Sequence, residues 1–224
     1  IYEDEQANPA MAVNAINKLI NIDEVKIIIG PAFSDSVLAV TPIAEKNKVV
    51  LIAPASGADQ IKFAGDYIFR NRVSASAIGE YTAEFAFKNR KTREISILFQ
   101  NSSNMIDYKN AFINKFQELG GKVLFESTFE RGEKDFRTQL IKLKESNSAN
   151  AFITGHVNEL GFILKQAAEM NLKLNWVSVP GIESNDLFKI TEYGAEGVIF
   201  ASETTSFKNS PEAVKFREEY LKLM

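Results

Sequence analysis

The chain has 224 residues, of which 45% are hydrophobic, and it carries 26 lysines and arginines against 29 aspartates and glutamates. This composition excludes a disordered chain, and a net charge of −3 gives no basic surface that would favour nucleic acid as a partner. The absence of cysteine excludes disulfides and thiolate metal sites, and no apolar run reaches the roughly 20 residues that a membrane-spanning helix needs.

Short apolar runs alternate with helical periodicity along the whole chain. The runs predict strands at residues 25–30, 49–53, 94–99, 122–126, 149–154, 174–179 and 198–202. The periodic segments predict helices at residues 10–20, 35–47, 75–90, 105–119, 133–146, 158–171 and 185–193. The first two strands, around Ile28 and Leu51, are apolar on both faces, which is typical of parallel strands covered on both sides. This alternation predicts a doubly wound α/β architecture.

Two segments interrupt the alternation. Residues 66–76 form an extended stretch followed by small residues, which suits a crossover between two lobes. Residues 203–211 follow the last predicted strand and suit a return crossover. We therefore expect a first lobe over 1–73, a second lobe over 74–203 and a return of 204–224 to the first lobe. Because residues 220–224 stop inside an amphipathic run, we expect a fragment in which the first lobe is incomplete.

Motifs of the common enzyme classes are absent. The sequence holds no glycine-rich dinucleotide or P-loop motif, no serine-nucleophile elbow and no zinc-protease helix. A Ser-His-Asp triad would have to use the single histidine, His156, but no serine lies in a nucleophile motif. No calcium-binding loop occurs either. We therefore expect a non-enzymatic protein with no resident metal and no cofactor.

The remaining candidate residues follow predicted strands, at the sheet edge where open α/β sheets bind ligands. Ser34 or Asp35 is expected at the N-cap of the next helix, where a hydroxyl and free backbone N–H groups would hold a carboxylate or another anion. A plain helix cap is the other interpretation. The small-residue loop at 54–59 lets a ligand approach the backbone, and its carbonyls suit an ammonium, although such loops are often only turns.

The second half of the chain supplies further strand ends, which would face these loops across a cleft. They contribute Asn101, His156 and Glu183. His156 alone is also typical of a structural histidine. Together the strand ends predict a clamp of two lobes.

Four stretches, in order along the chain, carry a resemblance to a known family. They are residues 8–30, the loops at 34–36 and 54–59, the segment 132–144 with the pattern G-x-x-D-F-x-x-x-L-x-x-L-K, and residues 194–198 with A-E-G-V. In these stretches the chain resembles the type I periplasmic binding proteins, in the branch of branched-chain amino-acid receptors of ABC importers. The resemblance implies two doubly wound parallel-sheet lobes that close on a small solute about a hinge.

The resemblance also implies roles for single residues. Ser34 would meet a ligand carboxylate, while Ala55, Ser56 and Gly57 would meet its ammonium. A hydroxyl is usual at the position of Gly57, and an acid is usual at the position of Pro180, with Glu183 as the nearest acid.

A buried ammonium without an acid is costly, so the ligand stays open between an amino acid and an organic or aromatic acid without an amine. Tyrosines are frequent in the family at the position of Met105 and at that of His156 or Val157. The polarizable side chain of Met105 would suit an aromatic acid.

The partners and the location follow from the same resemblance. It implies a membrane permease of an ABC importer, a signal peptide in the full-length precursor, and a periplasmic or extracellular location with or without a lipid anchor. Self-association of the fragment, which would cover exposed sheet edges, is a further expectation. Two alternatives remain: a ligand-sensing domain of a signalling receptor or regulator with the same bilobal fold, and a doubly wound enzyme that uses carboxylates or lysines.

Overall fold

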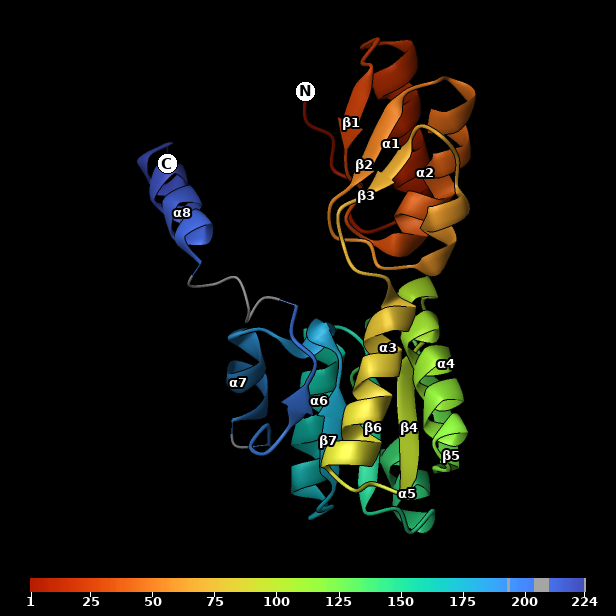
Figure 1. Cartoon of the computed structure of the whole chain (residues 1–224), viewed down its shortest axis with the longest axis vertical. Coiled ribbons are helices and arrows are strands. Elements are labelled where there is room, and N and C mark those ends of the chain that lie inside the picture. Colours follow the sequence, from red (N-terminus) through yellow and green to blue (C-terminus); the bar gives the residue numbers. More distant parts are fainter. Residues whose placement is uncertain (193, 204–209, 224) are drawn as a thin grey trace.

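The computed structural model describes residues 1–192, 194–203 and 210–223 and shows two α/β lobes, one above the other in Figure 1. Each lobe is built on its own sheet, and every strand pair in the two sheets is parallel. The predicted α/β fold with parallel sheets is therefore confirmed. None of the described helices is long and apolar enough to cross a membrane.

The first lobe holds three strands in the order β1-β2-β3. Its elements are α1 (Pro9–Asn21), β1 (Ile27–Ile29), α2 (Ser34–Lys46), β2 (Val50–Ala53), the 3₁₀ helix η1 (Asp59–Phe63) and β3 (Ile68–Arg70). Asn8 caps α1, since its side-chain oxygen accepts a hydrogen bond from the Ala10 N–H, and Pro9 fills the first turn.

The described part of the first-lobe sheet carries helices on one face. There α1 and α2 lie on the sheet (Figure 1). They bury Ile16, Val37 and Val40 against Leu51. On the other face Ile27 is 62% exposed and Ile29 is 75% exposed. Within the described residues, the expectation that both faces of the first strand are covered is therefore wrong.

The second lobe holds five strands in the order β5-β4-β6-β7-β8. Its elements are α3 (Ala75–Glu84), the π-helical turn η2 (Phe85–Asn89), β4 (Glu94–Gln100), α4 (Ser103–Glu118), β5 (Lys122–Phe129), α5 (Arg137–Glu145), β6 (Asn150–Thr154), α6 (Val157–Glu169), β7 (Asn175–Ser178), the 3₁₀ turn η3 (Pro180–Ile182), α7 (Asp186–Thr191) and β8 (Ile199–Phe200). Consecutive residues of β6 enter opposite cores: Phe152 packs with α3 and α4, and Ile153 with α5 and α6. This lobe is therefore doubly wound.

The predicted crossover at 66–76 contains the strand β3, so the connection between the sheets shortens to residues 71–74. The strand β3 ends at the charged Arg70, whereas the equally short β1 consists of three isoleucines, so the sequence indicated an extended segment here but not a strand. The two sheets thus separate between Arg70 and Ala75, and the exact lobe limits at 73 and 203 stay predictions.

The predicted return crossover at 203–211 falls mostly on residues 204–209, which lie outside the described residues. The helix that follows, α8 (Pro211–Leu223), has no buried residue and stands apart from both lobes in Figure 1. Its Phe216 is 70% exposed, and Tyr220 stacks on that ring. The return of 204–224 to the first lobe therefore stays a prediction.

Helices α3 and α4 pack closely at Gly79. A Cβ atom at this position would lie 2.4 Å from the backbone oxygen of Tyr108 and 3.0 Å from the Cβ atom of Ala111. Only a glycine lets the two backbones meet at this distance. The contact fixes Tyr108 directly below the crossover.

Replacing Gly79 with alanine should lower the free energy of unfolding by about 1–3 kcal/mol, because the added methyl group meets backbone rather than a flexible side chain. Denaturation in guanidinium chloride measures the change. Glu80→Ala alters an exposed neighbour on the same helix and should change stability by less than about 0.5 kcal/mol. Equal stability of the two variants would contradict the close packing.

Candidate ligand-binding site

The two loops at the carboxyl edge of the first-lobe sheet are tied to each other. The Ser34 hydroxyl accepts a hydrogen bond from the Ala58 N–H at 3.3 Å, and the Ser56 hydroxyl donates to the Ala32 carbonyl at 3.0 Å. Both serines are buried. The structure thus brings the loop after β1 together with the loop after β2, which contains Ala55, Ser56 and Gly57.

The start of α2 differs from the sequence prediction. Phe33 takes the N-cap position, and Ser34 is the first helical residue. Asp35 does not cap its own helix, because its carboxylate accepts hydrogen bonds from the Ser103 N–H at 3.0 Å and from the Ser103 hydroxyl. The prediction that Ser34 or Asp35 lies at the N-cap is wrong, since Asp35 instead meets the N-terminus of α4 in the other lobe.

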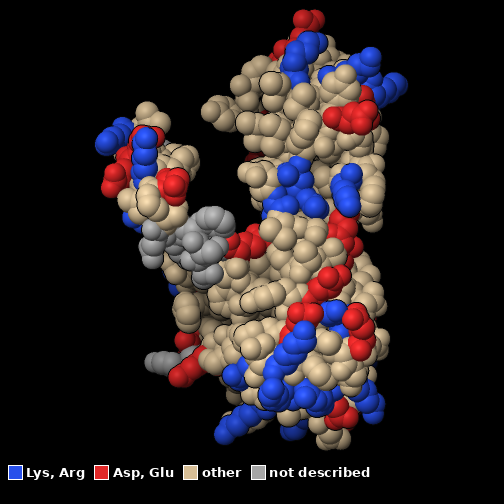
Figure 2. Space-filling view, in the orientation of Figure 1, with Lys and Arg blue, Asp and Glu red and all other residues tan. Residues whose placement is uncertain are grey.

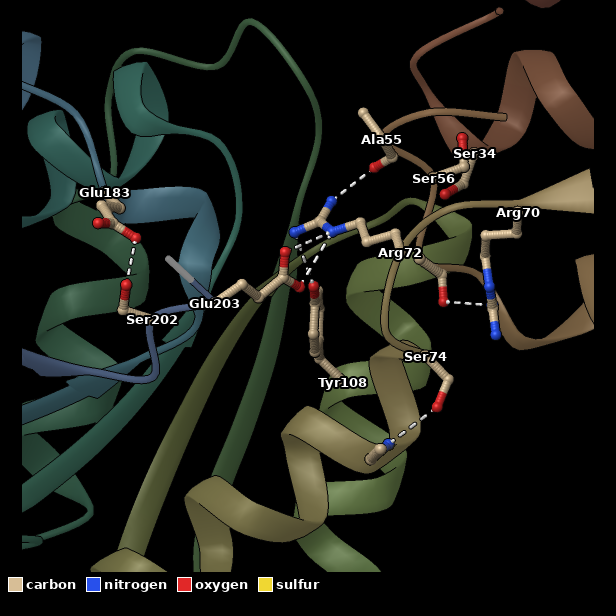
Figure 3. Close-up of polar contacts among 12 residues, drawn as sticks. Ser34, Ala55, Ser56, Arg70, Arg72, Ser74, Tyr108, Glu183, Ser202 and Glu203 are labelled. Carbon is tan, nitrogen blue, oxygen red and sulfur yellow. Dashed lines mark hydrogen bonds and ion pairs between the residues drawn. The ribbon is translucent and has the colours of Figure 1, made fainter. Parts of the chain in front are cut away.

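Two arginines cover the carbonyl groups of the loop after β2. The Arg70 guanidinium donates to the carbonyls of Gly57 at 3.2 Å and Ala58 at 2.9 Å. The Arg72 guanidinium donates to the Ala55 carbonyl at 2.6 Å (Figure 3). The carbonyls that were expected to meet a ligand ammonium are therefore bonded to cations of the protein itself.

Arg72 joins three parts of the chain. Besides Ala55 in the first lobe, its Nε lies 3.0 Å from both carboxylate oxygens of Glu203, after β8, and its Nη2 donates to the Tyr108 hydroxyl on α4 at 3.3 Å (Figure 3). Burial raises the pKa of Tyr108 to about 12, so this hydroxyl stays protonated at neutral pH. Sequence reasoning missed Arg72 and Glu203, although a charged residue inside a predicted crossover was a usable signal.

Arg72 and Glu203 line a cavity of about 660 Å³ beside η3 and β8. Glu183, a predicted site residue, lines the same cavity and accepts a hydrogen bond from the Ser202 hydroxyl at 2.7 Å. The remaining lining is largely apolar and consists of Pro180, Ile182, Ser184, Asn185, Leu187, Phe188 and Phe200. The structure thus places Glu183 with Arg72, while the described lining does not include the Ser34 and Ser56 loops.

The other predicted site residues lie elsewhere at the carboxyl edge of the second sheet. Asn101 is exposed after β4 and donates to Glu130 at 2.8 Å. Met105 is buried in the core between the sheet and α4, with only 2% of its surface exposed. His156 is the N-cap residue of α6, and its N–H donates to Gln100. Their roles as ligand contacts stay predictions.

The lobes touch each other next to the first-lobe loops. The rings of Phe33 and His156 meet edge to face, with centroids 5.3 Å apart. The Arg131 guanidinium also lies over the Phe33 ring, 4.3 Å from its centroid. On α4, the Asp107 carboxylate accepts a hydrogen bond from the Asp59 N–H at 2.9 Å. These contacts show that the two lobes form a common surface around the loops.

The described residues contain no group of three or more histidine, cysteine or acidic side chains that could hold a metal ion. The chemistry of this region is instead that of charged and hydrogen-bonding groups around an apolar cavity. Such a lining is typical of a ligand-binding pocket.

The fold and this arrangement can now be compared with known proteins. A family model described as periplasmic binding protein matches residues 1–224. The chain belongs to the periplasmic binding protein family. The resemblance seen in the sequence is thereby confirmed.

Individual members of the family are similar over most of this chain. A Leu/Ile/Val-binding protein from Escherichia coli is 28% identical over 197 residues, which cover 88% of this chain and 53% of that protein. The crystal structure of a leucine-binding protein from Thermotoga maritima matches with a TM-score of 0.91 at 30% identity, over 98% of this chain and 63% of that one. The chain thus spans about half the length of the E. coli relative.

A solute-binding protein of an ABC transporter from R. palustris, solved with 4-hydroxybenzoate, has a TM-score of 0.90 at 22% identity. The match covers 99% of this chain and 61% of that one. At this identity the likeness concerns the fold alone. The same fold therefore occurs in a protein that was solved with 4-hydroxybenzoate.

His156 provides a pH test of the contact between the lobes. Burial lowers the pKa of His156 below 6.5, and the Arg131 guanidinium adds to this effect. The folded protein therefore holds the ring neutral at a pH at which the unfolded chain already binds a proton.

As the pH falls from about 7 to about 5, this difference in proton binding should lower the free energy of unfolding. His156→Phe keeps a ring against Phe33 and removes the titration, so the variant should lose less stability than the wild type over this range. Denaturation curves at several pH values give the comparison. Parallel pH profiles for the two proteins would contradict the burial of a neutral His156.

Proposed function

We propose that this chain is part of an extracytoplasmic solute-binding protein of an ABC importer. It binds a small carboxylate-bearing solute, an amino acid or a related organic or aromatic acid, in the cleft between the lobes. The observation that carries the proposal is the pair of parallel-sheet lobes joined at residues 71–74, with a cavity of about 660 Å³ beside this crossover. Membership of the periplasmic binding protein family supports it.

Binding works by a shift between open and closed arrangements of the lobes. Residues 71–74 are the hinge, and the contacts of Asp35 with Ser103 and of Phe33 with His156 are made when the lobes meet. A ligand that touches both lobes gains contacts only in the closed form and therefore raises its population. The closed form is the one that a membrane permease recognises.

The remaining parts of the proposal follow from the family. The protein binds and delivers its solute without chemical conversion, and it acts in the periplasm or outside the cell. A signal peptide in the full-length precursor, with or without a lipid anchor, brings it there. Relatives named for leucine, isoleucine and valine, and a fold relative solved with 4-hydroxybenzoate, support both classes of ligand.

A thermal-shift screen of the full-length protein against amino acids, aliphatic and aromatic carboxylates, amides and sugars tests the proposal. A ligand at about 100 times its dissociation constant stabilises by roughly 2.7 kcal/mol, which should raise the melting temperature by several degrees. We expect this shift with at least one amino acid or organic acid. A shift with sugars alone, or none with any compound, would contradict the proposal.

Ser34→Ala tests the first-lobe loop as a ligand contact. If the hydroxyl meets a charged group of the ligand, its loss should weaken binding by about 1–3 kcal/mol in titration calorimetry. Thr128→Ala removes an exposed hydroxyl on β5 and serves as the control that leaves affinity unchanged. An unaltered affinity in Ser34→Ala would leave the serine only its bond to Ala58 and remove it from the site.

A further inference from the structure

We propose that the end of the second lobe farthest from the first lobe docks on an anionic phospholipid surface. The docking surface is a basic patch of five exposed side chains, Arg90, Lys91, Arg93, Lys142 and Lys144. The inference rests on the proposed function only in placing a membrane beside the protein. It assigns no solute and involves neither the cleft nor its cavity.

The first part of the basic patch is the loop that leads from η2 to β4. Four of the six residues at 88–93 are basic, and within the described chain only Lys88 among them forms an ion pair, with Glu84. The Arg93 guanidinium lies over the Phe87 ring, 4.0 Å from its centroid, and donates to the Phe87 carbonyl at 2.9 Å. The charge of Arg93 is thus held at the surface without a carboxylate partner among the described residues.

The second part of the basic patch comes from α5, which covers the opposite face of the same sheet. Lys142 and Lys144 lie in its last turn. The hydroxyl groups of Ser96 on β4 and Ser146 after α5 are 2.8 Å apart, so both parts reach the same edge of the sheet. Figure 2 shows lysines and arginines gathered at this lower end of the molecule.

Acidic side chains near the patch neutralise little of its charge. Glu84 already pairs with Lys88, and Glu94 lies 3.9 Å from Lys122. Glu145, at the end of α5, is exposed and offsets one of the five cations. The patch therefore keeps an excess of positive charge.

The helix dipoles account for only part of this charge. A cation near a helix C-terminus is favourable, which explains Lys142 and Lys144 at the end of α5. The effect fades beyond the last turn, whereas Lys91 and Arg93 follow the end of η2 at Asn89. The basic patch is thus larger than the helix ends require.

An extended anionic surface fits this distribution of charge. Since the whole chain carries a net charge of −3, the residues outside the patch are acidic on balance. A negatively charged membrane attracts the patch and repels the remainder, so the molecule meets it with this end first.

The side chains of the patch favour lipid headgroups over an acidic protein. Lysine carries its charge on a flexible stem and needs no fixed partner geometry, which suits mobile headgroups. Ile141, beside Lys142 on α5, is 49% exposed, and an apolar side chain among lysines suits the boundary between headgroups and acyl chains.

Cosedimentation with phospholipid vesicles tests the inference on the full-length mature protein without a lipid anchor. Vesicles of phosphatidylcholine are compared with vesicles in which about one third of the lipid is anionic phosphatidylglycerol. We expect at least about five-fold more protein on the anionic vesicles in ~0.1 M sodium chloride. This excess should disappear in ~1 M salt, at which charges are screened beyond about 3 Å.

Two triple variants separate the patch from the net charge of the protein. The patch variant carries Arg90→Gln, Lys91→Gln and Lys144→Gln. The control variant removes the same charge from exposed positions of the first lobe and carries Lys46→Gln, Lys48→Gln and Lys62→Gln. The patch variant should bind anionic vesicles at least about five-fold less than the wild type, and the control variant should bind as the wild type does. Both should keep the wild-type melting temperature.

The outcomes separate this inference from the proposed function. Equal binding to both kinds of vesicle, or an equal loss of binding in the two variants, would overturn the inference. Binding to soluble polyglutamate but not to anionic vesicles would also overturn it, in favour of an acidic protein partner. A protein that binds a solute but no vesicle contradicts only the docking surface, whereas one that binds anionic vesicles but no solute contradicts only the proposed function.

Discussion

The guanidinium of Arg72 is the group on which the region between the lobes depends. It is mostly buried, and a buried cation is unfavourable unless hydrogen bonds and an opposite charge surround it. The Ala55 carbonyl, the Tyr108 hydroxyl and the Glu203 carboxylate satisfy this need from three sides. The loop of one lobe, a helix of the other and the segment after the last strand are thereby held around a single residue of the crossover.

Much of the fold could be predicted because parallel sheets leave a strong imprint on the sequence. Strands of the second lobe, such as β6 with Phe152 and Ile153, are apolar on both faces and are buried on both. The same pattern in β1 predicted helices on both faces of the strand, but one face is exposed in the described residues. The hydrophobicity of a strand indicates that its faces favour burial, but it does not identify the residues that bury them. The strand β3 was missed because its apolar run stops at Arg70, whereas the equally short β1 consists of three isoleucines.

The candidate site could be predicted in part, for a topological reason. Residues after parallel strands collect at one edge of a sheet, so Glu183, which lines the cavity, could be selected without knowing any contact, whereas the roles of Ser34 and Ser56 stay predictions. The contacts of Arg72 could not be predicted, because its partners lie 17, 36 and 131 residues away along the chain and only the fold brings them together. Every residue has a backbone carbonyl, so the sequence could not indicate that the Ala55 carbonyl accepts a hydrogen bond from Arg72.

Helix α4 connects the contact between the lobes with the cavity that Arg72 and Glu203 line. Its first turn receives Asp35 from the first lobe at Ser103, where a carboxylate is favoured by the helix dipole. One turn later Asp107 accepts from Asp59, and the next residue, Tyr108, supports Arg72. The close packing of α4 against Gly79 of α3 restricts the position of the helix that carries these groups. The contacts with the first lobe and the support of Arg72 therefore depend on the same rigid helix, so a movement of α4 would disturb both together.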